Sequence, residues 1–498
     1  MVSASEKRYA VALLFDISGA FDNVWWPLVL QSLKERQCPR NIFKALCSYF
    51  DNRKVQISFG SVRVSKQASR GCPQGSVLGP ACWNLMFDGL LRYLEEIIGL
   101  NFAAYADDLV IIVNGNSRTE IETEGQRVVD AIVTWCRLAK LQLSESKTEA
   151  ILLKSNEIKR KPIGRRGGAR PDRKRKAVHR TIDFGNKPPA LRVNNTKIGF
   201  KSTVRYLGVH FDRGLRVTTH CRILKEKVES LFHKLGRLAR VHWGLKFRTL
   251  STIYRGVFAP TVAYAASGWA DLCTKSDIRI LKALQRRVLI SLTGAYRTAS
   301  WESLCVVAGV IPVDIVLQES RARYQFRSRQ NAKIGNIDIP QDVDKGIAVA
   351  RIRDEALSMW QANWHSSTKG RTTYAFFQDV RDRREWLVSH SMETDHWVSQ
   401  VFTGHGDFRA RLASLGLVED DTCVCGIEAD TVPHFLLRCP LFDAQRVALQ
   451  ERVPEDQWTW PEVAHFLVSD PEVFTVLAGY CSECLWLKSF ETSQVDSQ

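Results

Sequence analysis

The sequence predicts an α+β fold, and three observations support this prediction. Near-continuous apolar runs of strand length occupy Tyr9–Phe15, both sides of Asp107-Asp108, and Ala150–Leu153. Helical periodicity lies between these runs, which gives the order strand, helix, paired strands, helix, strand of a ferredoxin-like split βαβ unit. From about residue 216 onward, apolar residues recur mainly at helical spacing. We therefore expect one small sheet followed by helical regions.

The first apolar run is suited to a strand covered on both faces, and it ends at Asp16. The second and third runs flank Asp107 and Asp108, so this stretch predicts a tight β-hairpin whose two turn residues are the two aspartates. Neighbouring carboxylates repel each other, and a divalent cation is the usual way to keep both ionised beside a buried sheet. An ordinary surface turn is the alternative, because aspartate is common in turns.

Asp16 favours the metal hypothesis over the surface turn. Phosphoryl transfer by two metal ions needs carboxylates that converge from separate strands. Asp16, Asp107 and Asp108 would supply such a set, because they end or join three of the predicted strands.

The segment between the first two strands has helical periodicity over residues 22–50 and a short alternating strand at Val55–Phe59. A glycine-rich block, Gly71–Gly79, precedes an amphipathic helix predicted over Ala81–Ile98. Backbone N–H groups where a loop enters a helix can hold a phosphate or the edge of a base pair. Taken alone, the block is evidence only for a turn, because glycine and proline usually mark turns.

Further helices and hairpins follow the paired strands. Periodicity predicts a helix over Ile121–Leu138, and Leu191–Val193 and Lys197–Ile198 predict a hairpin around Asn194-Asn195. Apolar residues from 224 to 238 alternate with lysines and an arginine at helical spacing. Such a helix can lie along a nucleic-acid backbone, where lysines bind phosphate, although a packed helix with one wet face has the same pattern.

Charge favours a polyanionic partner. The 498 residues contain 70 Lys and Arg against 53 Asp and Glu, a net charge of +17, with a pI near 9.4. Residues 154–180 carry a dense basic run that cannot bury a core, so we expect it to order only on RNA or DNA, or to serve as a nuclear-localisation patch. The thirteen cysteines occur mostly singly, which indicates free thiols in a reducing compartment. No apolar run approaches membrane-span length.

Three blocks carry a resemblance to a known family. Tyr105-Ala106-Asp107-Asp108 resembles the YxDD box of reverse transcriptases, and Phe15–Asp22 resembles their first palm motif. Arg70–Pro80 is similar to their loop and helix that contact template and nucleotide. The form Gln-Gly-Ser-Val-Leu-Gly-Pro within this block is that of non-LTR retrotransposons rather than retroviruses. The order and spacing of the three blocks identify the chain as a member of this family.

The resemblance implies an RNA-directed DNA polymerase that uses an RNA template, a DNA primer or target, and dNTPs. It places Mg²⁺ or Mn²⁺ on Asp16, Asp107 and Asp108. It assigns nucleotide and template contacts to Ile17, Phe21, Pro73, Gln74, Gly75, Tyr105 and Ala106.

Two of the implied roles have simpler alternatives. The ring of Phe21 would lie beneath the incoming sugar and exclude a 2′-hydroxyl. The alternative is that the ring only makes a hydrophobic contact with the helix that follows. Lys147 falls in the fourth motif, where a lysine would protonate the departing pyrophosphate, although an ordinary solvated lysine is the alternative. Val204–Asp212 resembles the primer-grip hairpin.

Near the end of the chain, Cys423, Cys425, His434 and Cys439 have the residue types of a structural zinc site. The gap of one residue between the first two cysteines is shorter than usual. Cys-Cys-His-Cys knuckles of this form follow the thumb in the type-one retrotransposable elements of insect ribosomal genes, so the resemblance implies Zn²⁺ here. Cys481 and Cys484 could be rival ligands, but their Leu- and Trp-rich setting favours a buried helix.

The family comparison also predicts an organisation. We expect a palm at 1–153 that lacks the fingers, a basic insertion at 154–190, primer-grip hairpins at 191–215, a thumb at 216–300, a helical region at 301–410, and a zinc-knuckle region at 411–498. The early position of Asp16 predicts a fragment of a polyprotein that also holds an upstream endonuclease. A nuclear site of integration after cytoplasmic synthesis is implied. The alternatives are a weakly active nucleic-acid-binding remnant and an endonuclease within residues 300–498.

Overall fold

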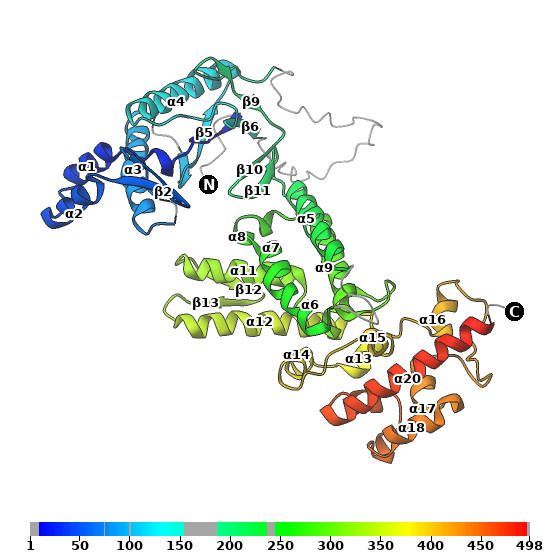
Figure 1. Ribbon diagram of the computed structural model, residues 1–498. Coiled ribbons are helices and arrows are strands. Elements are labelled where there is room, and N and C mark those ends of the chain that lie inside the picture. The colour runs from blue at the N-terminus through cyan, green and yellow to red at the C-terminus, as the bar shows by residue number, and fades with distance from the viewer. Residues whose placement is uncertain (1–8, 74, 99–100, 154–186, 237–244, 496–498) are drawn as a thin grey trace, which may run out of the picture. The chain divides into compact units, whose positions relative to one another are not determined.

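The computed structural model describes residues 9–73, 75–98, 101–153, 187–236 and 245–495 (Figure 1). Its contacts divide the chain into two units, residues 1–219 and 220–498. The first unit holds the predicted sheet, and the second is mostly helical. The mixed α and β composition agrees with the predicted α+β class.

A five-stranded sheet forms the centre of the first unit, with strand order β4-β5-β1-β6-β9. Neighbours are antiparallel except β6 and β9, which are parallel. The bounds are β1 (Tyr9–Phe15), β4 (Asn101–Tyr105), β5 (Asp108–Gly115), β6 (Glu149–Leu153) and β9 (Gly199–Phe200).

The central strand β1 is covered on both faces, as its unbroken apolar run predicted. Val11, Leu13 and Phe15 belong to the large core. Ala12 instead packs in a smaller cluster, against Ile151 of β6. Residues two apart along a strand share a face, so the alternation assigns the two sets to opposite sides of the sheet.

The large core is completed by four helices. They are α1 (Trp26–Glu35), α2 (Arg40–Phe50), α3 (Leu78–Ile98) and α4 (Arg118–Leu138). Both long helices start three residues earlier than predicted, and each has a serine at its start. Ser76 Oγ accepts from Gly79 N at 2.9 Å, and Ser117 caps α4 by accepting from Glu120 N.

Three two-stranded hairpins complete this unit: β2 (Lys54–Phe59) with β3 (Val62–Gln67), β7 (Arg192–Val193) with β8 (Thr196–Lys197), and β10 (Thr203–Tyr206) with β11 (Val209–Asp212). The β7–β8 hairpin turns at Asn194-Asn195, which confirms that prediction. For the first hairpin only the strand at 55–59 was predicted, and β3 is an addition. The basic run at 154–180 lies outside the described residues.

The second unit begins with the long helix expected from the 224–238 periodicity, since α5 spans Thr218–Gly236 and so lies almost wholly in this unit. Next come helix α6 (Phe247–Ile253), a single π-helical turn, η2 (Tyr254–Phe258), and α7 (Ala259–Ala263), α8 (Ala266–Trp269) and α9 (Lys275–Thr293). A capping box between Thr274 and Asp277 starts α9, and Gly294 ends it with φ +69°.

The rest of the chain is largely helical, as predicted, with one small hairpin. Buried aromatic residues such as Trp360, Trp364 and Phe402 fill its core. None of the described helices is both long and apolar enough to cross a membrane. The elements are α10 (Trp301–Val307), α11 (Val313–Arg327), β12 (Ala332–Ile334), β13 (Ile337–Ile339), α12 (Lys345–Ser366), α13 (Arg371–Phe376), α14 (Val380–Ser389), α15 (His396–Thr403), α16 (Arg409–Ser414), α17 (Val432–Leu437), α18 (Asp443–Gln450), α19 (Glu462–Phe466) and α20 (Pro471–Val495).

Candidate active site and metal centre

Strand register brings the predicted carboxylates to one end of the sheet. The last pair between β1 and β5 is Phe15 with Leu109. Asp16 and Asp108 are the next residue on each strand, so they follow this pair as cross-strand neighbours. Asp107 lies beside them in the turn between β4 and β5.

The turn differs from the prediction by one residue. Tyr105 pairs with Asp108, so the turn residues are Ala106 and Asp107, and Asp108 opens strand β5. Ala106 has φ +53°, a conformation that the first turn residue of a type II′ hairpin requires. An alternating apolar pattern predicts the strands but cannot say which polar residue opens the second one.

Trp83 holds this turn in place. Its indole N–H donates to the carbonyl oxygen of Ala106 at 2.9 Å, and the side chain is completely buried in α3. A buried indole needs an acceptor for its N–H. The sequence analysis did not single out Trp83, because the residue lies on the apolar face of an amphipathic helix and the acceptor is 23 positions away.

The carboxylates act on one another electrostatically. The pKa of Asp108 is raised, first because the side chain is partly buried and then because Asp107 and Asp16 carry like charges. Arg205 opposes this shift, and Asp108 in turn helps to raise the pKa of Tyr206. The predicted primer-grip hairpin β10–β11 therefore lies within electrostatic reach of the carboxylates.

Asp16 also has a cationic partner. Lys147 Nζ lies 3.3 Å from Asp16 Oδ2, with the lysine side chain 70% exposed. The loop before β6 places Lys147 there, because Ser144 N donates to Asp16 O at 2.8 Å. Lys147 thus lies beside the carboxylates, as the fourth-motif resemblance implied, although its observed partner is Asp16. The three aspartates do not form a closed group of metal ligands comparable to the cysteine–histidine group described below.

Ile17 does not present its side chain to a ligand. It is 2% exposed, within the large core, and forms an isolated bridge with Leu143. Only its backbone could contact a nucleotide. The core position follows from the register, because Ile17 continues the inward-facing series of Leu13 and Phe15.

Phe21 lies against the glycine-rich block. Its ring centroid is 6.1 Å from that of Trp83, and its carbonyl accepts from Cys72 N at 2.8 Å. Gly71 allows this approach: its φ is +90°, and a Cβ there would lie 2.6 Å from the carbonyl oxygen of Asp22. Any other residue at 71 would push the block away from Phe21.

The other predicted contact residues are open to solvent. Pro73, Gly75 and Tyr105 are exposed, and Tyr105 is 68% exposed. Ala106 is half-buried, beneath the turn that it opens. Gln74 lies outside the described residues.

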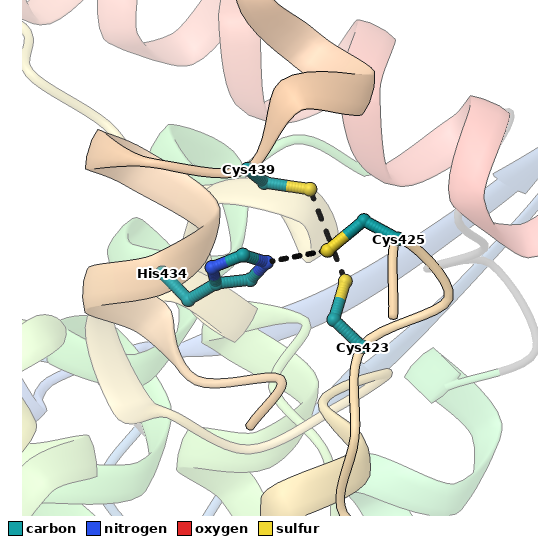
Figure 2. A group of neighbouring side chains, drawn as sticks. All are labelled: Cys423, Cys425, His434 and Cys439. Carbon is teal, nitrogen blue, oxygen red and sulfur yellow. Dashed lines mark hydrogen bonds between the residues drawn. The ribbon is translucent and has the colours of Figure 1, made fainter. Parts of the chain in front are cut away.

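In the second unit, Cys423, Cys425, His434 and Cys439 come together (Figure 2). Their potential ligand atoms all lie within 4.8 Å of one another, the one such group found in the described part of the chain. The sulfur atoms of Cys423 and Cys439 are 3.8 Å apart, and Cys425 Sγ is 3.3 Å from His434 Nε2. Tetrahedral zinc with bonds of about 2.3 Å to sulfur requires sulfur–sulfur edges of about 3.8 Å.

Local backbone geometry assembles this group. Cys423 N donates to Glu428 O, and Gly426 N donates to Cys423 O, which closes a tight turn. Gly426 adopts φ +76° in that turn, a backbone conformation that glycine reaches without steric cost. Thr431 then caps α17 by accepting from His434 N, which orients the histidine.

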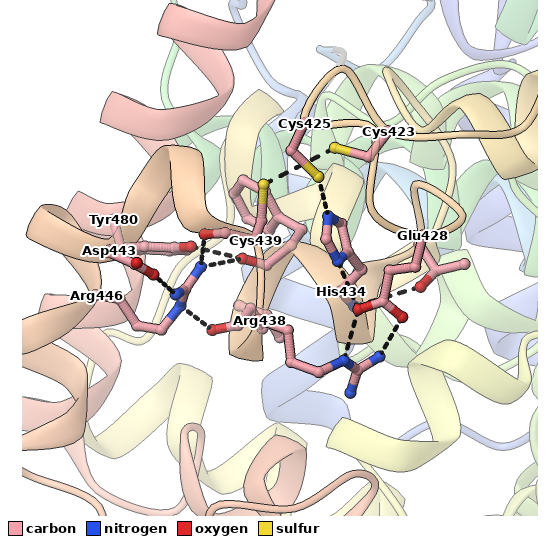
Figure 3. Close-up of polar contacts among 12 residues, drawn as sticks. Cys423, Cys425, Glu428, His434, Arg438, Cys439, Asp443, Arg446 and Tyr480 are labelled. Atoms are coloured by element: carbon pink, nitrogen blue, oxygen red, sulfur yellow. Dashed lines mark hydrogen bonds and ion pairs between the residues drawn. The ribbon is translucent and has the colours of Figure 1, made fainter.

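Glu428 is a functional residue that the sequence analysis missed. Its carboxylate accepts from His434 Nδ1 at 2.8 Å and from Arg438 Nε at 2.7 Å (Figure 3). The pKa of Glu428 is lowered to about 2, chiefly by Arg438 and then by His434. A carboxylate on the distal nitrogen fixes the tautomer and orientation of a ligating histidine. The sequence feature that could have pointed to Glu428 is its position six residues before His434.

Burial affects two of the candidate ligand thiols. Burial raises the pKa of Cys423 to about 12 and also raises that of Cys439. The donor set fits Zn²⁺, which displaces thiol protons when it binds. All thirteen cysteines are free. Cys481 and Cys484 are fully buried in α20, so the buried-helix alternative is confirmed for them.

Comparison with known proteins agrees with these features. Residues 2–211 match the family described as reverse transcriptase (RNA-dependent DNA polymerase). The chain is 40% identical over 390 residues to the retrovirus-related Pol polyprotein from type-1 retrotransposable element R1 4 of Nasonia vitripennis, an alignment that covers 76% of the chain and 93% of that relative.

Two further relatives are longer proteins. The Pol polyprotein from type-1 retrotransposable element R1 of Bradysia coprophila is 32% identical over 450 residues, which are 89% of the chain and 42% of the relative. The RNA-directed DNA polymerase from mobile element jockey of Drosophila funebris is 24% identical over 296 residues, 58% of the chain and 29% of the relative. The chain therefore belongs to the reverse transcriptases of R1-type non-LTR retrotransposon Pol polyproteins, and it spans less than half the length of the latter two relatives.

Proposed function

We propose that this chain extends a DNA primer along an RNA template, with Asp16, Asp107 and Asp108 holding two Mg²⁺ or Mn²⁺ ions, as target-primed reverse transcription requires. The observation that carries the proposal is the register that ends β1 and opens β5 with neighbouring carboxylates. The strand order β4-β5-β1-β6 with its helices supports a ferredoxin-like palm. The helices after residue 216 would then form the thumb.

When bound, the ions would activate the primer 3′-hydroxyl and stabilise the departing pyrophosphate. Oxygen ligands suit Mg²⁺, and the three carboxylates supply them. Lys147 would have to release Asp16 when the metals bind, which leaves its ammonium group free to face the pyrophosphate. Phe21, supported by Trp83, would limit space at the sugar.

Primer extension on an RNA template tests this proposal. We would assay the chain, and the chain preceded by the upstream portion of the Bradysia relative, each with and without Asp107→Asn. The substitution should reduce synthesis by several orders of magnitude, because it removes a metal-binding charge while keeping the side-chain shape. Near-normal synthesis by the Asp107→Asn protein would refute the assignment. Inactivity of both starting proteins would favour the alternative of a nucleic-acid-binding remnant.

We also propose that the cysteine–histidine group binds one zinc ion and that its surroundings contact RNA or target DNA. The sulfur–sulfur separation and the Glu428–His434 contact support a zinc site. Within residues 300–498, the described part of the chain offers no second group of metal ligands, so we do not adopt the endonuclease alternative there.

Purified full-length chain should contain one zinc per molecule. Glu428→Gln should weaken zinc retention about 10–100-fold, the usual loss when the carboxylate partner of a ligating histidine is changed. Elemental analysis and competition with a chromogenic chelator measure both quantities. Glu451→Gln, an exposed glutamate at the end of α18, is the matched control. Zinc-free protein purified without chelators would contradict the metal assignment.

A further inference from the structure

A cavity in the second unit has features of a binding site that neither proposal above uses. Its volume is about 360 Å³, near the lower end of the range of small-molecule sites, ~300–1,000 Å³. It lies between α6, the π-helical turn and α7 on one side and α12, α14 and the segment that joins α10 to α11 on the other. Phe247, Val310 and Ile311 give it an apolar wall.

Four arginines line the cavity, against two glutamates. They are Arg248, Arg255, Arg353 and Arg384, with Glu319 and Glu393. Glu319 accepts from Arg353, itself a lining residue, at 2.7 Å, and from Arg323, which is not one of the lining residues, at 2.5 Å, so four guanidinium groups in the lining stand against two carboxylates. The net charge of the lining is therefore positive.

Two of these guanidinium groups donate to neutral oxygen atoms. Arg255 Nη2 donates to Ser251 Oγ at 2.9 Å, and Arg384 Nη1 donates to Gly309 O at 2.7 Å. Each contact uses one side of a planar group that has five N–H donors. Donors therefore remain for a ligand with several acceptor oxygens.

Electrostatics of the cavity favour an anion. The pKa of Arg384 is lowered to about 10, first by burial and then by the like charge of Arg353; Glu319 opposes this shift, and Arg255 adds to it. Arginines that repel one another in a partly dry site are stabilised when a shared anion lies between them. Bidentate geometry makes a phosphate group the best match to guanidinium donors.

The wall behind Arg255 is rigid. Tyr254 OH accepts from Gln285 Nε2 at 2.8 Å, and the same nitrogen donates to Ile311 O at 2.9 Å. Gln285 Oε1 accepts from Val313 N and from Trp301 Nε1, each at 2.9 Å. The buried Gln285 thus ties the π-helical turn to the opposite side of the cavity. Single π-helical turns occur frequently at functional sites.

We propose that this cavity binds one nucleotide unit of a nucleic-acid strand, with a phosphate between Arg255, Arg353 and Arg384 and the base against the apolar wall. Phosphate recognition by arginine together with base contact on apolar side chains is the usual mode of sequence-tolerant single-strand binding. The proposal goes beyond the polymerase assignment and does not depend on it, since all its residues lie in the second unit.

Isothermal titration of the full chain with adenosine 3′,5′-bisphosphate, in 150 mM salt without Mg²⁺, primer or dNTPs, tests it. This probe carries both phosphates that flank one nucleotide. We expect one bound molecule per chain and a Kd at least tenfold higher for Arg255→Gln. Ala259→Phe, which fills the cavity without changing charge, should have the same effect. Arg351→Gln, an exposed arginine on α12 outside the cavity, should leave Kd unchanged.

Other outcomes would overturn the proposal. Equal weakening by Arg351→Gln would show general charge attraction, and equal binding of unphosphorylated adenosine would show that phosphate is not recognised. The Kd of a ten-nucleotide RNA should change from variant to variant in the same order as the Kd of the bisphosphate. If the substitutions weaken binding of the free bisphosphate but not of the RNA, the ligand is a free nucleotide and not a strand. Circular dichroism of each variant checks folding, and Arg255→Lys, which keeps the charge, should recover part of the affinity.

Discussion

Trp83 fixes the conformation on which the candidate active site depends. The hairpin places Asp107 through a positive φ at Ala106, a conformation that costs alanine free energy. The indole hydrogen bond to the Ala106 carbonyl is a specific interaction that holds the residue in that state. The precision of the carboxylate arrangement is therefore set by a residue that does not touch the substrate.

Trp83→Phe should lower kcat for primer extension about tenfold, with a smaller change in KM for the dNTP. It keeps an aromatic ring but removes the indole N–H, so the Ala106 carbonyl is left unpaired at a cost of about 1–3 kcal/mol. A change of about 1.4 kcal/mol in the barrier is tenfold in rate. Steady-state kinetics on the active form of the protein measures this. Trp135→Phe, in a tryptophan packed against the same core, is the control. Identical kinetics of the two variants would contradict the positioning role.

Asp108 should make the fold less stable when no Mg²⁺ is present. Its pKa is raised in the folded protein, so its stabilising contribution is complete below the unfolded pKa and is lost as pH rises through the folded value. Asn cannot ionise. In Mg²⁺-free buffer at pH 7, Asp108→Asn should therefore melt at a higher temperature than the unsubstituted protein, and the difference should disappear in acid.

Calorimetry over a pH series measures this difference. Excess Mg²⁺ should reverse the order, since only the unsubstituted site gains stability from the bound ions. A lower melting temperature for Asp108→Asn at pH 7 without Mg²⁺ would show that burial and like-charge repulsion at Asp108 do not destabilise the fold there.

At the scale of elements, α20 is tied to the segment that carries the cysteine–histidine group by a buried ion pair. Lys488 Nζ lies 2.7 Å from Asp430 Oδ2, and both side chains are almost fully buried. Asp430 also accepts from Arg409 N. Nearby, Arg446 donates to Leu436 O and Tyr480 OH donates to Phe435 O, which ties α17 to α18 and to α20. Figure 3 shows Arg446 and Tyr480. The helix that carries His434 is thus held by elements outside the metal ligands.

Lys488→Met should destabilise this region by about 3–5 kcal/mol, because it leaves the Asp430 carboxylate buried without its partner. The measurement is the urea concentration at which zinc is released to a chelator, which reports this region alone. The double variant Lys488→Met with Asp430→Asn should recover part of the loss, since no buried charge remains. An unchanged midpoint for Lys488→Met would show that the pair contributes little.

Element types were largely predictable because periodicity reports burial. The apolar run at 9–15 predicted a two-faced strand, and β1 is one. Strand β3 was missed because it has only two apolar residues, Val62 and Val64, among polar and basic ones, and such a composition resembles a loop when no core face is required. The turn was misplaced by one residue because register is set by backbone pairing. Glu428 and Trp83 escaped prediction because their partners are defined only by the folded chain.

At the scale of the whole molecule, the net charge of +17 makes nucleic-acid affinity depend on ionic strength. The second unit holds the cysteine–histidine group, the helices after residue 219 and the arginine-lined cavity. The carboxylates lie in the first unit. Phosphate contacts made by the second unit would then contribute to affinity without taking part in chemistry. Polymerisation and strand retention are consequently separable by substitution.

The β2–β3 hairpin determines how the protein behaves in concentrated solution. On one face of it, Ile57 pairs with Val64, Phe59 pairs with Val62, and Val55 pairs with Lys66. Phe59 is 88% exposed. Uncovered apolar strands promote aggregation, and at low salt only the repulsion between highly charged molecules opposes it. The same salt that releases nucleic acid should therefore cause the protein to self-associate, and light scattering should show that Phe59→Ser raises the salt concentration at which particles form.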